Sequence, residues 1–133
     1  MQRMLTSTLI SIVFVALVQL ASRTAAAQDY PSARFGEQSG AEIYRSICQA
    51  CHMPDARGAV GAGAYPALAS NRHLQAALYP VGLVINGRKA MPAFGDSLTD
   101  AQIAAVVNFI RSNFGNRYKD VVTPAMVSRL RPQ

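Results

Sequence analysis

Cys48-Gln49-Ala50-Cys51-His52 is the stretch of sequence from which the rest of the chain can be interpreted. Two cysteines three positions apart lie on one face of a helical turn, and a histidine follows the second cysteine directly. This spacing suits covalent attachment of haem, because the two thiols add across the two vinyl groups as thioethers. The motif therefore predicts one covalently bound haem c, anchored by Cys48 and Cys51, with His52 as the proximal iron ligand.

Three other interpretations of the two cysteines fit the rest of the sequence less well. A thioredoxin-like redox pair requires a βαβ pattern, which the sequence does not show. Half of a zinc site requires further ligands, and beyond the motif only His73 offers one, at an unsuitable spacing. A structural disulfide between Cys48 and Cys51 would close a very small loop and would stabilise the fold little. Haem attachment remains the preferred interpretation.

The first 27 residues have the pattern of a secretory signal peptide. Arg3 supplies the positive charge, residues 9–20 form the apolar segment, and Ala25-Ala26-Ala27 offers a cleavage site before Gln28. The alternative is an uncleaved membrane anchor, although the apolar segment is shorter than the roughly 20 residues of a spanning helix. Export to the periplasm agrees with the motif, since bacteria attach haem c after export.

Length and charge restrict the possible functions further. The 133 residues suffice for one small domain. Without residues 1–27, the chain has 11 basic and 7 acidic side chains, a net charge of +4. Such a moderately basic surface can attract an acidic protein partner. It lacks the clusters of Lys and Arg interleaved with aromatic residues that bind nucleic acids, so we expect no nucleic-acid partner.

The part of the sequence after the signal predicts helices joined by irregular segments. Residues 28–38 show no periodicity and are expected to form an irregular leader. Ser39-Gly40-Ala41-Glu42 fits a capping box, so a first helix should run from there into the haem motif and stop before Pro54. Residues 55–70 are rich in Gly, Ala and Pro and are expected to be an irregular loop.

A second helical region is expected after this loop. Asn71 is the predicted cap of a helix over about residues 72–78, which Pro80 interrupts. Residues 81–85 then form another helical turn or two, and Gly87 ends the region.

The last long helix is predicted over residues 100–113. Thr99 is its cap, and Gln102 completes a second capping box. Residues 117–133 are expected to form a C-terminal extension packed on the domain, with a short helical turn that starts at Thr123-Pro124. The apolar residues of the long helix form one stripe with two flanking aromatic rings: Ile103, Val106, Val107 and Ile110, with Phe109 and Phe114.

Met91 is the candidate for the second axial ligand of the iron. A Met/His pair is the ligation of electron-carrying cytochromes, and Met91 lies in a loop ahead of a proline, outside any helical stripe. The alternatives are Met126 in the C-terminal extension and His73, which would give a bis-histidine site. Met53 adjoins His52 and cannot reach the opposite face of a haem.

Several spaced motifs together resemble those of class I cytochromes c, over residues 39–116. The resemblance implies an all-α fold of three to five helices around one covalently bound haem, in which the first and last helices cross at nearly right angles. The motifs that carry it are Cys48-Gln49-Ala50-Cys51-His52, Tyr65-Pro66-Ala67-Leu68, Asn86-Gly87-Arg88 and Met91-Pro92-Ala93-Phe94.

The resemblance also implies roles for individual residues. Gly40 and Tyr44 correspond to a small and an aromatic residue on the first helix, which meet Val106 and Phe109 on the last helix. The carbonyl of Pro66 corresponds to the one that accepts a hydrogen bond from the proximal imidazole. Predicted walls of the haem pocket, all apolar, are Leu68, Leu78, Val84, Phe94 and Phe109.

The C-terminal sequence is similar to that of small cytochrome c components of bacterial periplasmic or membrane-bound dehydrogenases. This similarity implies a periplasmic carrier of single electrons, not itself an enzyme, that works between a dehydrogenase and an oxidase or another cytochrome of the respiratory chain. Contact with the membrane would come only through a partner or an uncleaved signal. The residues concerned are Asn113-Phe114-Gly115-Asn116, Val122-Thr123-Pro124 and Leu130-Arg131-Pro132.

Two other functions stay open at this level. A haem enzyme or gas-binding sensor would have an open or labile sixth position on the iron. A haem-free protein with a structural disulfide would contain no thioether-linked cofactor at all.

Overall fold

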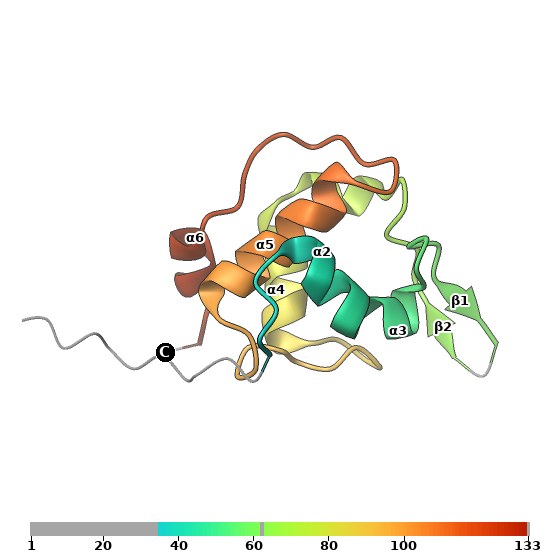
Figure 1. Cartoon of the computed structure of the whole chain (residues 1–133), viewed down its shortest axis with the longest axis horizontal. Coiled ribbons are helices and arrows are strands. Elements are labelled where there is room, and N and C mark those ends of the chain that lie inside the picture. The colour runs from blue at the N-terminus through green and yellow to red at the C-terminus, as the bar shows by residue number, and fades with distance from the viewer. Residues whose placement is uncertain (1–34, 62, 133) are drawn as a thin grey trace, which may run out of the picture.

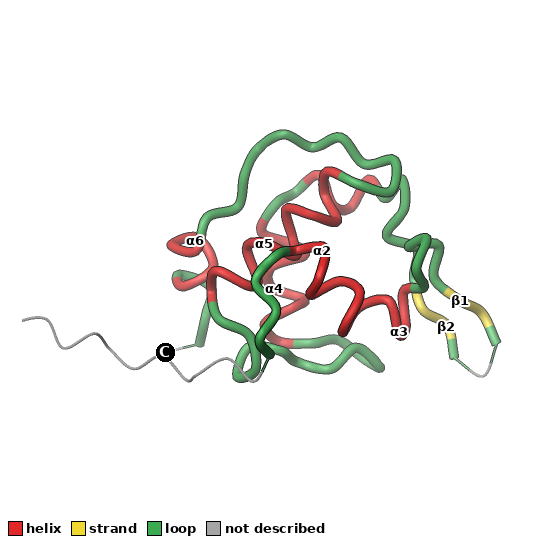
Figure 2. Tube along the Cα trace, in the orientation of Figure 1, coloured by secondary structure: helices red, strands yellow, loops and turns green. Residues whose placement is uncertain are grey.

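A computed structural model describes residues 35–61 and 63–132 of the chain (Figure 1). The predicted signal peptide, residues 1–27, and most of the predicted leader, residues 28–38, lie outside this part. Helices dominate the described residues, and strands form only one small hairpin (Figure 2). None of the described helices combines the length and the apolar character needed to cross a membrane.

The elements follow one another along the chain in two groups, and Figure 1 labels most of them. The first group comprises α2 (Gly40–Ile43), the π-helix η1 (Tyr44–Cys48), α3 (Gln49–His52), β1 (Ala59–Val60) and β2 (Ala64–Tyr65). The second group comprises the 3-10 helix η2 (Arg72–Gln75), α4 (Leu78–Asn86), α5 (Asp100–Ser112) and α6 (Pro124–Ser128).

The first helical run, α2 to α3, confirms the helix predicted from its capping box. The Glu42 N–H donates to Ser39 Oγ at 3.2 Å, and the Ser39 N–H donates to Glu42 Oε2 at 3.1 Å. The middle of the run winds as the π-helix η1, which adds a residue to the turn and which the capping pattern did not predict. Met53, with φ of 65°, ends the run directly after the haem motif.

The segment at residues 55–70, predicted to be an irregular loop, contains an antiparallel hairpin. Ala59 pairs with Tyr65 and Val60 pairs with Ala64, so the fold is mostly helical but not purely all-α. Strands of two residues built from Ala, Val and Tyr carry no alternating pattern, which is why the sequence did not reveal them. The hairpin projects beside α3 (Figure 1).

Pro80 does not interrupt a helix, contrary to the prediction. It is the third residue of α4, within the first turn, where backbone N–H groups have no acceptor inside the helix and proline is tolerated. The helix predicted at residues 72–78 is instead the short η2. Its cap is Asn71, as predicted, whose side-chain oxygen accepts from the His73 N–H at 2.9 Å.

Helix α5 forms the centre of the core and confirms the predicted apolar stripe. The Gln102 N–H donates to Thr99 Oγ1 at 3.2 Å, and the Thr99 N–H donates to Gln102 Oε1 at 2.9 Å, which is the predicted capping box. Gln102 Nε2 also donates to the carbonyl oxygens of Phe35 and Glu37, both at 2.8 Å. The four stripe residues are almost fully buried: Ile103, Val106, Val107 and Ile110.

Gly40 allows α2 to lie against α5, in front of it in Figure 1. A Cβ atom on Gly40 would lie 2.1 Å from the carbonyl oxygen of Ala105 and 2.7 Å from the Cβ of Phe109. Only a residue without a side chain permits this approach. Ala105 and Phe109 are thus the nearest neighbours of Gly40, whereas Val106, the partner implied by the resemblance, is buried in the core.

The chain after α5 arches over this helix before α6 (Figure 1). Asn108 of α5 holds both backbone groups of Val122: its Nδ2 donates to the carbonyl oxygen at 2.8 Å, and its Oδ1 accepts from the N–H at 2.9 Å. Thr123 then caps α6 and Pro124 is its first residue, as predicted. Val127 of α6 is fully buried, so this turn packs on the core.

Arg111 is a buried cation that joins α5, η2 and the C-terminal segment. Its Nε donates to the carbonyl oxygen of Leu74 at 2.8 Å, and its Nη2 donates to that of Gln75 at 3.2 Å. The same guanidinium binds Asp120, with Nη2 at 2.6 Å from Oδ1 and Nη1 donating to the backbone carbonyl. The side chain is only 1% exposed, so these bonds offset the cost of burying its charge.

The close approach of α2 and α5 makes a direct prediction about stability. Gly40→Ala should lower the free energy of unfolding by about 1–3 kcal/mol, because the added methyl group overlaps the Ala105 carbonyl oxygen. Gly82→Ala is the control: a Cβ there meets no atom within 4 Å, and alanine should stabilise α4 by about 1 kcal/mol. Denaturant unfolding measures both changes. An unchanged midpoint for Gly40→Ala would contradict the tight helix contact.

The ion pair between Arg111 and Asp120 should make the stability of the protein depend on pH. The side-chain hydrogen bond from Arg111 holds the pKa of Asp120 below its ordinary value. A carboxyl with a lowered pKa contributes stability above its unfolded pKa of about 3.9, and this contribution is lost as the pH falls through the folded pKa. Asp120→Asn should therefore destabilise the protein near neutral pH, and the difference from wild type should shrink below about pH 4.

Arg111→Met provides the matched background for this measurement. In that background, the pH-dependent change caused by Asp120→Asn should be much smaller, because the largest cause of the lowered pKa of Asp120 has gone and only its backbone hydrogen bond still lowers it. Urea unfolding of the four proteins near neutral pH and at about pH 3 measures the coupling. A pH-dependent effect of undiminished size in the Arg111→Met background would show that Arg111 is not the main cause of the lowered pKa of Asp120.

Candidate functional site

The cysteines of the motif lie at the end of η1 and within α3, at the edge of the core. Both are free and partly buried, and Cys48 packs against the core residues. Burial, with a smaller contribution from Cys51, raises the pKa of the Cys48 thiol to about 11. Cys48 is therefore a protonated thiol near neutral pH, which differs from the low-pKa thiolate of a thioredoxin-like redox pair.

His52 has a defined partner for one of its two ring nitrogens. Its Nδ1 lies 2.9 Å from the carbonyl oxygen of Pro66, the residue that the resemblance implied for this contact. Because a carbonyl oxygen only accepts hydrogen bonds, Nδ1 must carry the proton. The lone pair of the neutral ring is then on Nε2, which is the nitrogen left to bind a metal.

Backbone hydrogen bonds hold the loop that brings Pro66 back to His52. The Gly58 N–H donates to the carbonyl oxygen of His52 at 3.0 Å, directly before the hairpin. The N–H groups of Leu68 and Ala69 both donate to the carbonyl oxygen of Ala56, at 2.8 and 2.9 Å. Gly58 has φ of 69°, and a Cβ there would lie 2.1 Å from the carbonyl oxygen of Tyr65. The glycine therefore permits the close return of the chain.

Tyr44 forms a hydrogen bond with the residue that ends α3. Its Oη donates to the carbonyl oxygen of Met53 at 2.8 Å. The ring centroid is 5.7 Å from that of Phe109 and 4.9 Å from that of Phe114. Burial is the main cause that raises the pKa of Tyr44 to about 12, so the phenol stays a protonated donor. This bond fixes the direction in which the chain leaves His52.

Met91 lies in the loop between α4 and α5, and its partly buried side chain packs against the core. Arg88 and Met91 exchange two backbone hydrogen bonds, at 2.9 and 3.0 Å, and so form a tight bridge. Gly87, with φ of 68°, precedes this bridge, and a Cβ there would lie 2.6 Å from the Met91 carbonyl oxygen. The thioether is therefore carried by a rigid turn and not by a helical face.

The other predicted site residues differ in how they are placed. Leu68, Phe94 and Phe109 are partly buried and pack against the core, and Val84 is buried. Leu78 departs from this group because it is 46% exposed. These five residues lie in four parts of the chain: the segment after β2, α4, the loop after α4, and α5.

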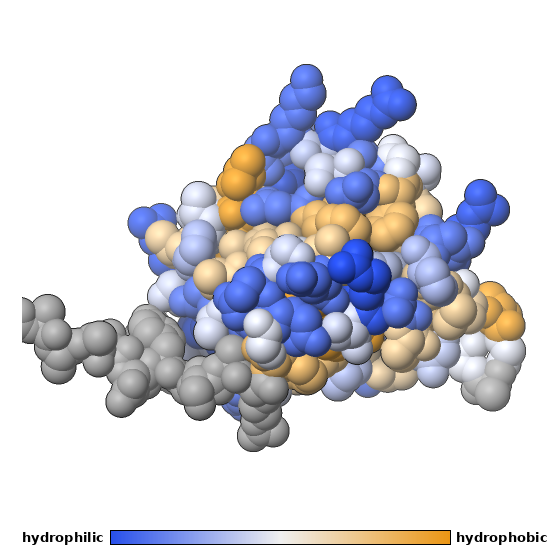
Figure 3. Space-filling model, viewed as in Figure 1, coloured by the Kyte–Doolittle hydropathy of each residue, from blue (hydrophilic) through white to orange (hydrophobic). Residues whose placement is uncertain are grey.

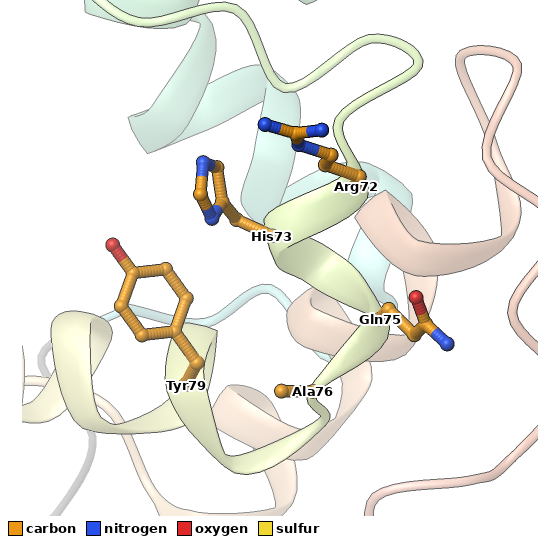
Figure 4. Close-up of a pocket in the computed structure, with 5 residues that line it drawn as sticks. All are labelled: Arg72, His73, Gln75, Ala76 and Tyr79. Atoms are coloured by element: carbon orange, nitrogen blue, oxygen red, sulfur yellow. The ribbon is translucent and has the colours of Figure 1, made fainter.

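The alternative ligand His73 belongs to a different surface feature. It lines a shallow, open pocket of about 470 Å³ with Arg72 and Tyr79. Figure 4 shows the rings of His73 and Tyr79 side by side, and their centroids are 6.1 Å apart. The other alternative, Met126, lies on α6.

Apolar surface occurs in small patches between hydrophilic side chains on the face shown in Figure 3. The projecting hairpin is one such place, since Val60 in β1 is 94% exposed. The hairpin follows the haem motif closely in the chain and is joined to it by the bond from Gly58 to His52.

The sequence analysis named Asn116 only as part of a resembling motif and predicted no structural role for it. Asn116 is only 4% exposed and binds the backbone at three points: the N–H of Asn71 and the carbonyl oxygens of Leu68 and Ile110. In the sequence it is an asparagine shortly after a helix and next to a glycine, which is typical of an ordinary turn. No local signal distinguishes it from a solvent-exposed turn residue.

Comparisons with known proteins show which proteins this chain is similar to. Residues 36–110, more than half of the chain, match the family model described as cytochrome C oxidase, cbb3-type, subunit III. The cytochrome subunit of fructose dehydrogenase from Gluconobacter japonicus is 34% identical over 102 residues, which cover 65% of this chain and 21% of that protein.

Two further relatives are cytochrome c subunits of other dehydrogenases. That of gluconate 2-dehydrogenase from Pantoea cypripedii is 37% identical over 106 residues, which cover 71% of this chain and 24% of the relative. That of alcohol dehydrogenase (quinone) from Gluconacetobacter polyoxogenes is 35% identical over 105 residues, which cover 69% and 22%.

The present chain spans less than a quarter of the length of these curated relatives. The family match covers α2 to the greater part of α5, and so includes the two thiols, the oriented imidazole and the Met91 turn. On these grounds the chain belongs to the family of c-type cytochrome domains described as cytochrome c oxidase, cbb3-type, subunit III.

Proposed function

We propose that this chain is a monohaem c-type cytochrome with the class I fold, which carries single electrons and is not itself an enzyme. Haem c would be anchored by Cys48 and Cys51, with His52 and Met91 as axial ligands. One observation carries the proposal: the Pro66 carbonyl oxygen accepts from Nδ1 of His52 at 2.9 Å, which leaves Nε2 for iron on the histidine that follows the two cysteines of the motif in the chain.

The donor set of the described residues fits a covalently held haem. Each cysteine thiol would add across one vinyl group, with its sulfur bonding to one vinyl carbon and its proton passing to the other. An imidazole nitrogen and a thioether sulfur are the axial donors that electron-transfer haems use. The bound haem would supply the redox chemistry, because its iron exchanges one electron between the ferrous and ferric states.

The residues around the two axial donors would set the reduction potential. The Pro66 carbonyl increases the electron density on the His52 ring through the Nδ1–H hydrogen bond, which favours ferric iron. The Met91 thioether favours ferrous iron and so raises the potential. Predicted wall residues such as Leu68 and Phe94 would keep water from the haem face, which also disfavours the additional charge of ferric haem.

The relatives suggest where the electrons come from. Their names describe cytochrome subunits of fructose, gluconate and alcohol dehydrogenases. We therefore propose that this chain accepts electrons from a dehydrogenase and passes them to an oxidase or another cytochrome. In this proposal residues 1–27 direct export to the periplasm, residues 39–116 form the haem domain, and residues 117–133 are an extension packed on it.

The ligation by Met91 can be tested by spectroscopy. Met91→Ala should abolish the weak far-red absorption of Met-ligated ferric haem, give a high-spin spectrum, and lower the midpoint potential by on the order of 0.1 V or more. Met126→Ala is the matched control and should change neither property. A wild-type ferric protein that is already high-spin and binds cyanide at once would instead favour an open sixth position and a sensor or peroxidase-like role.

The covalent attachment has its own test, in a host that matures c-type cytochromes. The wild-type protein should stain for haem after denaturing electrophoresis, because only thioether-linked haem survives this treatment. Cys51→Ala removes one of the two thioethers and should greatly reduce the yield of stained protein. A colourless wild-type protein with free thiols at Cys48 and Cys51 would refute the proposed function.

A further inference from the structure

Two segments far apart in the sequence are joined next to the site. Residues 66–71 return from the hairpin, and residues 113–118 follow α5. The Ser70 N–H donates to the carbonyl oxygen of Phe114 at 3.0 Å, and Tyr118 Oη donates to that of Asn71 at 3.3 Å. The first of these segments begins with Pro66, the partner of His52.

Asn116 forms the centre of this junction. Its Oδ1 accepts from the Asn71 N–H at 2.9 Å, and its Nδ2 donates to the carbonyl oxygens of Leu68 and Ile110, both at 2.8 Å. The residue is only 4% exposed. Because a buried amide is costly unless its groups are paired, all three bonds favour one arrangement of the two segments.

Three consecutive carbonyl groups of the returning segment are each held by a side chain. His52 Nδ1 binds that of Pro66, and Asn71 Nδ2 donates to that of Ala67 at 2.7 Å. Asn116 Nδ2 binds that of Leu68. The same two peptide groups, at Ala67–Leu68 and Leu68–Ala69, also donate their N–H groups to the carbonyl oxygen of Ala56. The side-chain bonds hold the opposite, carbonyl side of these planes, so losing them gives the neighbouring Pro66 carbonyl more freedom to rotate away from His52.

We propose that Asn116 is a positioning residue for His52: by clamping residues 68–71 to the segment after α5, it holds the Pro66 carbonyl oxygen at the imidazole Nδ1–H. The proposal rests on the proposed function, in which His52 ligates the haem iron. It gives the segment after α5, residues 113–118, a role in setting the electronic properties of the proximal ligand. Asn116 itself does not touch the imidazole.

Loss of the clamp has a definite consequence for the ring. The Nδ1–H would be exposed to solvent more often, because the Pro66 carbonyl would leave its position in a larger fraction of molecules. The imidazole would then be a weaker electron donor and would stabilise ferric iron less. The midpoint potential should therefore rise, in the direction opposite to that expected for loss of Met91.

Nitrogen-resolved NMR of the reduced, diamagnetic protein tests the proposal through the exchange of the His52 Nδ1–H with solvent. Asn116→Ala should increase this exchange rate about tenfold or more and shift the potential upward. Asn116→Asp is a second variant: its carboxylate still accepts from the Asn71 N–H but no longer donates to the Leu68 carbonyl oxygen. It should also accelerate exchange, and it decides the question if Asn116→Ala does not fold.

Asn108→Ala is the matched control. Asn108 also binds two backbone groups of the chain after α5, but at Val122, where it holds nothing next to Pro66. This variant should leave the exchange rate and the potential unchanged. Equal acceleration in Asn108→Ala, or wild-type exchange in whichever of Asn116→Ala and Asn116→Asp folds, would overturn the positioning role.

The outcomes separate this proposal from the proposed function. Haem staining and the far-red absorption of the wild-type protein report on the haem and its ligands, whatever Asn116 does. The His52 Nδ1–H signal reports on the contact with Pro66 whether or not haem is bound, because both partners belong to the chain. A protein without haem would therefore refute the proposed function and still show whether Asn116 controls the imidazole.

Discussion

The structure of the site depends on one hydrogen bond, from His52 Nδ1 to the carbonyl oxygen of Pro66. It determines which ring nitrogen has a free lone pair, and it requires the chain to turn back on itself within fourteen residues. The hairpin at residues 59–65, the left-handed glycine at position 58 and the bonds to Ala56 together produce this return. The tight return of the chain after the motif thus places the Pro66 carbonyl oxygen at the imidazole.

The same contact connects the site with the packing of the helices. The motif is carried by a helical run whose beginning is pressed against α5 at Gly40 and whose Tyr44 packs on Phe109. The segment that contains Pro66 is held by Asn116, which follows α5. Contacts with α5, or with the segment that follows it, therefore hold both partners of the hydrogen bond in place. This helix is the most buried one of the described chain. A shift of this helix would be transmitted to both sides of the imidazole.

Local signals predicted the starts of the helices well. Ser39, Asn71, Thr99 and Thr123 all act as caps through a side-chain oxygen, because capping involves residues only two or three positions apart. The error in the predicted helix boundaries came from a residue whose effect depends on its position in the helix. Proline breaks a helix interior but is accepted in its first turn, so the error about Pro80 concerned where α4 begins.

The sequence by itself determined the helical character of the chain, the caps, and the pairing of two cysteines with a histidine, since each of these is a matter of spacing along a few residues. Only the tertiary structure decided the hairpin, the π-helical turn, the burial of Arg111 and the clamp made by Asn116. The physical reason is that a buried polar side chain is satisfied by backbone groups distant in sequence, up to 48 positions away for Asn116. Such partners leave no periodic or local pattern, so they become visible only when the chain is folded.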